Sequence, residues 1–301
     1  MLLQKPFAAV LGAATSILAM TSVAIADGST KDAAPAPEAP KSPFTYSFNV
    51  GVTTDYVFRG YSQKREEPAL QGGIDLTYAV RSDVSAYFGI WGSGVDFGPN
   101  PDGSRIVGAE VDVYGGIKPR WEKATFDLGV IWYTYPGAND GGPAVNQVFE
   151  QNYVELKLGV SGLLASFFPQ IDKLTTGSTV FWSPEYQGKQ GSVWTLESTA
   201  SYEFAKLWVF TPSISGTLGS QYGESDHNNN ASGFTLGNGK DSLYYWNAGF
   251  TLSVEKLSFD FRYWDTNVKN NNLADGGLNN WCKGPFLQCD ERFVFTAKYT
   301  Y

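Results

Sequence analysis

The sequence predicts an all-β protein, a transmembrane antiparallel up-and-down β-barrel of about 12 strands. Three observations support this fold class. Apolar and polar residues alternate with a period of two through most of the chain, as in strands with one apolar face. Most alternating runs cover about 9–11 residues, the length that a tilted strand needs to cross a bilayer. Short turns and long polar loops also alternate along the chain, which is typical of outer-membrane barrels.

The first 43 residues precede the predicted barrel. Lys5, the apolar run 7–20 and the small residues Ala24 and Ala26 indicate a secretory signal peptide over 1–26. A transmembrane helix is the alternative, but the run is short for the roughly 20 apolar residues of a span. Residues 27–43 are rich in Ala and Pro and predict a flexible segment. The barrel is then expected over 44–301.

Twelve runs of alternating residues follow in order. They cover 46–58, 70–80, 84–90, 110–118, 126–133, 154–160, 178–182, 194–204, 208–218, 246–254, 257–263 and 293–301. The seventh run is the poorest match to a strand. The connection 161–177 that precedes it falls on the short-turn side, yet it is long and partly apolar.

A soluble β-sandwich would also alternate apolar and polar residues. Its strands are usually shorter, with a mode near 5–6 residues, and its loops need not alternate in length by side. The chain also ends inside an alternating strand, on Tyr299 and Tyr301. This ending looks like the assembly signal of bacterial outer-membrane barrels. It implies the barrel assembly machinery and outer-membrane lipids as partners.

The composition excludes several kinds of function. A net charge of −8 argues against nucleic acid as a partner, because phosphate contacts need clustered Lys and Arg. One His and two Cys leave few ligands for zinc or an iron–sulfur cluster, so neither a metal nor another cofactor is expected. His227 lies in an Asn-rich loop without a Ser or acid at a catalytic spacing. The sequence therefore does not predict an enzyme.

Cys282 and Cys289 lie in the last long loop. Paired cysteines outside the inner membrane usually form a disulfide, and such a bridge is predicted here. A metal site is the weaker alternative, because no His or second Cys pair lies near in the sequence.

If the apolar face of each strand contacts lipid, the polar face lines the lumen. The predicted lumen residues are Asp55, Arg59, Gln71, Asp75, Glu110, Asp112, Lys118, Asp127, Glu155, Lys157, Glu197, Asp260, Arg262 and Lys298. With Arg120 added, eight acids face six bases, which predicts a slight cation preference, since carboxylate rings favour cations. Alternatively, these groups pair across strands and close a narrow lumen. Asp55 and Arg59 are expected either to pair and hold the first loop or to form part of a constriction.

Several segments resemble one bacterial family, the TorF-type porins, also labelled Gcw_chp. The resemblance rests on VTTDYVFRGYSQ at 52–63 and PALQGGID at 68–75. Later segments that look like the family are EVDVYGG at 110–116, YTYP at 133–136 and WSPEY at 182–186. The chain departs from the family over 162–178, which is expanded. The resemblance implies an outer-membrane barrel with a transport role.

Two functions from different classes follow as expectations. The first is a narrow passive channel in the outer membrane for ions or small solutes. The alternative is a closed, non-conducting barrel with a binding or structural role through its long loops. The sequence does not determine the oligomeric state or the identity of the solute.

Overall fold

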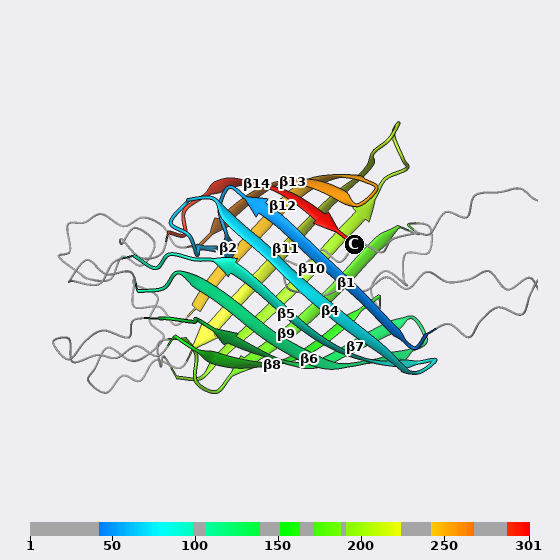
Figure 1. The fold of residues 1–301 in the computed structure, drawn as a ribbon, viewed down its shortest axis with the longest axis horizontal. Coiled ribbons are helices and arrows are strands. Elements are labelled where there is room, and N and C mark those ends of the chain that lie inside the picture. Colours follow the sequence, from blue (N-terminus) through cyan, green and yellow to red (C-terminus); the bar gives the residue numbers. More distant parts are fainter. Residues whose placement is uncertain are drawn as a thin grey trace, which may run out of the picture.

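The computed structural model describes residues 42–98, 106–138, 151–162, 171, 173–187, 191–223, 242–267 and 288–301. They form a closed antiparallel barrel of twelve strands, which confirms the predicted fold class (Figure 1). Each strand pairs with its neighbours in sequence, and the first strand pairs with the last. The described residues contain no helix long and apolar enough to cross a membrane. That finding does not bear on crossing by strands.

The barrel strands have the following bounds: β1 (Phe44–Thr53), β4 (Ala69–Arg81), β5 (Val84–Gly94), β6 (Ala109–Trp121), β7 (Ala124–Thr134), β8 (Tyr153–Ser161), β9 (Leu174–Ser183), β10 (Val193–Glu203), β11 (Thr211–Gly223), β12 (Ser242–Val254), β13 (Leu257–Thr266) and β14 (Arg292–Thr300). Two further short strands, β2 (Val57–Phe58) and β3 (Tyr61–Ser62), form a sheet of their own in the connection from β1 to β4. The weakly predicted seventh strand is present as β9.

Most predicted runs are shorter than the strands of the structure, and two runs extend by several residues beyond the strand that they predict. The first was expected to run to Phe58, but β1 ends at Thr53 and the chain then turns. The ninth was expected to begin at Trp208, but β11 begins at Thr211. Trp208 has a positive φ of 56° and lies in a turn between Leu207 and Phe210, which form an isolated bridge. In both places the alternation in the sequence extends beyond the residues that form the strand.

The connections alternate in length, as predicted. Tight turns join β4 to β5, β6 to β7 and β12 to β13 at one end of the barrel, here called the turn end. Longer connections join β1 to β4, β5 to β6 and β7 to β8 at the other end, the loop end. The connection from β8 to β9 is the long exception at the turn end; residues 163–170 and 172 lie outside the described residues.

Apolar side chains cover the outer surface of the barrel. Leu70, Leu158, Leu218 and Phe261 are each more than half exposed, and they come from four different strands. A water-soluble protein rarely exposes so extended an apolar surface, whereas lipid tails cover it in a membrane barrel. The closed ladder also leaves no room for the alternative of a soluble β-sandwich.

Glycines on the inner face let large side chains lie flat against the wall. A Cβ on Gly89 of β5 would overlap the ring and hydroxyl of Tyr114 on β6. The Tyr114 ring crosses Gly89, and its hydroxyl donates a hydrogen bond to Asp75 Oδ1 at 2.5 Å. Residue 89 therefore has no space for a side chain while Tyr114 keeps this position.

Substitution of Gly89 by alanine is expected to lower the free energy of unfolding by about 1–3 kcal/mol, as in an overpacked core. Gly94 of the same strand is the matched control, because nothing lies within 4 Å of a Cβ built there. Gly94→Ala should be neutral or slightly stabilising. Guanidinium unfolding of the refolded barrels in phospholipid vesicles measures both. Equal stabilities of the two variants would contradict this packing argument.

Candidate functional site

The first loop, residues 54–68, folds into the loop end of the barrel. Its β2 and β3 strands form a hairpin whose two turn residues are Arg59 and Gly60. Both have positive φ, 50° and 84°, which is the feature of a type I′ turn. Glycine adopts this conformation freely, whereas an arginine pays a strain cost of about 1–2 kcal/mol. We call the hairpin and its turn, residues 57–62, the plug.

Arg59 at the tip of the plug reaches the opposite wall. Its Nη1 and Nη2 donate to Glu155 Oε1 and Oε2 of β8 at 2.6 and 2.8 Å. Four strands separate β1 from β8 in one direction around the barrel (β4, β5, β6 and β7) and six in the other. This bidentate ion pair therefore spans the lumen. Arg59 Nε makes no hydrogen bond among the described residues and lies 3.9 Å from Glu197 Oε1 of β10.

The guanidinium of Arg59 lies between two aromatic rings. The Phe58 ring is 4.7 Å from its central carbon and the Phe181 ring of β9 is 4.9 Å away. The side chains of Arg59 and Glu155 are almost completely buried. Burial opposes the charge of Arg59, but Glu155 outweighs it, so that the pKa of Arg59 is raised well above its usual value. The tip is thus held by its ion pair and by cation–π contacts with two rings.

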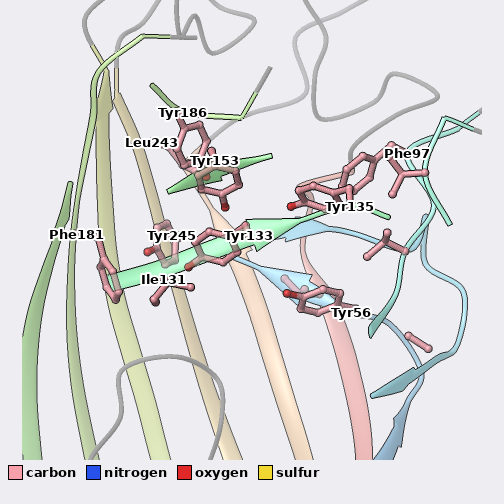
Figure 2. Packing of buried hydrophobic residues seen from close by; sticks show 14 of the residues in the cluster. Tyr56, Phe97, Ile131, Tyr133, Tyr135, Tyr153, Phe181, Tyr186, Leu243 and Tyr245 are labelled. Atoms are coloured by element: carbon pink, nitrogen blue, oxygen red, sulfur yellow. The ribbon is translucent and has the colours of Figure 1, made fainter. Parts of the chain in front are cut away.

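An aromatic layer fills the space around the plug (Figure 2). Tyr133 stacks on Tyr153 with ring centroids 4.4 Å apart, and Tyr153 packs against Tyr186. Tyr133 also contacts Phe58 of the plug, at 5.8 Å between ring centroids. In Figure 2 the rings of Tyr133, Tyr153 and Tyr186 lie inside the barrel near Tyr245. The described residues of the plug and this layer therefore occupy the lumen at the loop end.

The base of the plug is attached to the last strand. Ser62 Oγ donates to Asp55 Oδ1 at 2.7 Å, and Arg292 Nη1 of β14 donates to Asp55 Oδ2 at 2.9 Å. Burial raises the pKa of Asp55, and the hydrogen bonds from Ser62 and Arg292 lower it only in part. The expected pairing of Asp55 with Arg59 is wrong. These residues share one face only while a strand continues, and β1 ends at Thr53.

Carboxylates surround the plug on the barrel wall. Tyr56 donates to Glu110 Oε1 at 2.7 Å, and Tyr245 donates to Glu197 Oε1 at 2.6 Å. Asp112 is buried beside them, and its Oδ1 has no hydrogen-bond partner among the described residues. Arg59 is the only plug residue that forms an ion pair with these wall carboxylates. The loop end therefore holds more acids than bases among the residues described.

The other predicted lumen residues lie farther from the plug toward the turn end, except Gln71, which lies near the loop-end start of β4. Asp127 pairs with Lys157 at 3.0 Å and lies 3.9 Å from Lys118. Arg262 pairs with Asp260 at 2.9 Å. The remaining three are Gln71, which donates to Ser93 Oγ, Asp75, which accepts from Tyr114, and Lys298, which is half-buried on β14. The structure thus divides the predicted set into two groups along the barrel axis.

Several residues that hold the plug in place were not among the predicted site residues. They are Phe58 and Ser62 of the plug itself, Phe181 of β9 and Arg292 of β14. One local signal was available: a glycine at position 60 between two short aromatic segments is typical of a two-residue hairpin turn. The partners across the lumen have no such local signal.

Other expectations concern the cysteines, the last strand and metals. Cys289 is fully buried, while Cys282 and His227 lie outside the described residues, so the disulfide stays a prediction. Tyr299 and Tyr301 lie on and just after β14, facing outward beside Phe48. No group of three potential metal ligands occurs among the residues described.

Comparison with solved structures finds membrane proteins of low identity. The COG4313 outer membrane channel from Pseudomonas putida F1 is 12% identical, with a TM-score of 0.48, over 89% of this chain and 99% of that chain. LpxR from Salmonella typhimurium is 10% identical, with a TM-score of 0.44, over 85% and 99%. The NanC porin is 9% identical, with a TM-score of 0.43, over 84% and 98%. Likeness at this level says nothing about activity.

A search of curated proteins finds no significant match to the chain. A family model covers nearly all of the barrel sequence, from residue 37 to residue 301. Its match includes the plug and both groups of charged lumen residues. The chain therefore belongs to the bacterial family described as proteins of unknown function and labelled Gcw_chp.

Proposed function

We propose that this protein is an outer-membrane channel for ions or small hydrophilic solutes, closed at its loop end by the plug. One observation carries the proposal: the lumen is closed by a hairpin of a loop and not by the barrel wall. β2 and β3 pair with each other and with no wall strand, and Ser62 N of β3 donates to Gln288 O, which precedes β14. The plug can therefore withdraw without breaking any pairing between wall strands. The predicted signal peptide, 1–26, and the aromatic end of the chain would direct the barrel to the outer membrane.

The inner wall toward the turn end supports a hydrated path. Small polar side chains face inward there and are half-buried, among them Asn49, Thr199, Ser201, Ser213 and Ser215. In an outer-membrane barrel the short turns face the periplasm. Twelve strands also lie between the eight that side chains fill and the sixteen that enclose an open channel. A narrow pore fits these dimensions.

The slight cation preference belongs to the same proposal. Withdrawal of Arg59 would leave Glu155 and Glu197 facing the path, close to Glu110 and Asp112. Carboxylates around a constriction favour cations. The preference would then arise at the loop end, where the plug had been.

Planar-bilayer recordings with a salt gradient test the proposal. The wild-type barrel should open rarely, whereas replacement of residues 57–62 by a Gly-Ser linker should give frequent conductance steps with a mild cation preference. Asp112→Asn in the linker variant should weaken this preference. Asp265→Asn is the matched control, because Asp265 lies on the outer face of β13 beside Tyr263 and should change nothing.

The filled loop end favours one second candidate, a closed barrel that binds a partner or supports the envelope through its long loops. A linker variant that is folded but silent would reject the channel and favour this candidate. Heat-dependent migration on gels, which reports a folded barrel, is recorded for every variant, so that a silent channel is not confused with an unfolded one.

A further inference from the structure

A second group of charged residues lies toward the turn end, away from the plug. Asp127 of β7 accepts a hydrogen bond from the Tyr87 hydroxyl at 2.7 Å. The ammonium group of Lys157 lies 3.0 Å from Asp127 Oδ2, and that of Lys118 lies 3.9 Å from the same oxygen. One carboxylate therefore faces two ammonium groups. The exposed fractions of the three charged side chains are only 6–12%.

This group carries one positive charge in excess. Lys157 is paired with Asp127, whereas Lys118 Nζ makes no hydrogen bond to another described residue. The Tyr87 ring, 4.6 Å from Lys118 Nζ, offers partial compensation through its π face. An excess charge in a buried place costs several kcal/mol unless a counter-ion or water solvates it.

The other charged groups on this part of the wall do not supply the missing negative charge. Arg262 Nε forms an ion pair with Asp260 Oδ2 at 2.9 Å. Asp75 acts on both Lys118 and Lys298. Three acids (Asp75, Asp127 and Asp260) therefore face four bases (Lys118, Lys157, Arg262 and Lys298), and one positive charge stays in excess.

A small cavity adjoins Lys118 and Asp127. Its volume is about 40 Å³. Hydroxyl side chains from four strands line it: Thr125, Ser161, Thr175, Thr179 and Thr199. A water needs roughly 10–15 Å³ of such volume, so the cavity has room for a monatomic ion or a few waters. Its lining can donate hydrogen bonds from one ammonium group and several hydroxyls.

We propose that this cavity binds a small inorganic anion of the halide class. The excess ammonium charge supplies the attraction, and the hydroxyls supply neutral donors around the ion. A cation would meet the ammonium group of Lys118 in the lining, and that of Lys157 on the other side of Asp127, and be repelled. The size of the cavity selects a monatomic anion over a carboxylate or a sugar. This site lies on the barrel wall and does not depend on whether the plug opens or the barrel conducts.

Chloride NMR on the refolded full-length mature chain in zwitterionic micelles tests the site, with ³⁵Cl as the probe. Exchange of chloride at a protein site broadens the ³⁵Cl line, and bromide should compete for it. Lys118→Met, which keeps the apolar stem, should remove most of the excess linewidth. Lys64→Met, in the first loop, is the matched control and should leave the linewidth unchanged.

Two further variants separate anion binding from a structural role. Asp127→Asn leaves both lysines and removes the only carboxylate of the group, so it should increase chloride affinity. A structural role alone predicts no such gain. Thr199→Val keeps all charges, is expected to fold, and should reduce affinity by removing one donor. Equal linewidths for the wild type, Lys118→Met and Thr199→Val would overturn the proposal, as would a loss of binding in folded Asp127→Asn.

Discussion

Replacement of Arg59 by methionine is expected to lower the free energy of unfolding by about 3–5 kcal/mol, because it leaves the Glu155 carboxylate buried without its ion-pair partner. Tyr133, which donates to Glu155 Oε2 at 3.1 Å, cannot replace a bidentate arginine. The same change should free the plug from the far wall and make channel openings frequent. Guanidinium unfolding in phospholipid vesicles and bilayer recordings measure the two effects.

A double variant identifies the cause of that loss. Arg59→Met combined with Glu155→Gln leaves no unpaired charge, so much of the stability should return while the channel stays open. Arg81→Met is the matched control: Arg81 pairs with Asp83 at 3.2 Å on the surface, with 67% and 53% of the side chains exposed. Its loss should cost less than about 1 kcal/mol. If Arg59→Met and Arg81→Met proved equally stable, the ion pair across the lumen would have no structural importance.

Substitution of Gly60 by alanine is expected to displace the plug. A Cβ at this position would lie 2.5 Å from Thr266 Cγ2 and 3.0 Å from Tyr245 Cβ, closer than side chains can approach. The φ of 84° adds a backbone cost of about 1–2 kcal/mol for any residue with a Cβ. Because β2 and β3 pair with no wall strand, the hairpin can move away without unfolding the wall. The channel should therefore open often, while the free energy of unfolding of the barrel wall changes little.

Gly137 offers a control with the same backbone cost and no steric clash. Its φ is 72°, and nothing lies within 4 Å of a Cβ built there. Gly137→Ala should lose a similar amount of free energy of unfolding through its positive φ and leave conductance at the wild-type level. Were both variants to open the channel equally, backbone strain alone, rather than contact with Thr266, would explain the effect.

The wall of the barrel could be predicted from the sequence because each strand is specified by the residues within it. Alternation fixes which residues face lipid, and run length fixes whether a strand can cross the bilayer. Even β9, with only a short alternating run, was found near its true place. Strand ends were predicted less well, since Trp208 shares the alternation of β11 but lies in the turn that precedes the strand.

The plug could not be predicted in the same way because contacts with residues far away in the sequence hold it in place. Alternation from Tyr46 to Phe58 reads as one continuous strand, and nothing within those residues shows that the ladder ends at Thr53. The partner of Arg59 lies 96 positions later in the chain, at Glu155. Sequence spacing carries no information about that distance in space. The acids were therefore counted as one set, although the structure separates those at the plug from those near the turn end.

The attachment of the first loop to β14 bears on the order of folding. Asp55 and Arg292 are 237 positions apart, and the partners of Arg59 also follow it by many strands. Contacts between residues so distant in sequence form late, because a long chain segment must first be closed into a loop. The first loop is synthesised before nearly all of the residues that it contacts. Its polar groups therefore stay hydrated until the last strand has joined β1. Closure of the barrel and seating of the plug are thus expected as two successive kinetic phases, with the ion pair formed in the second.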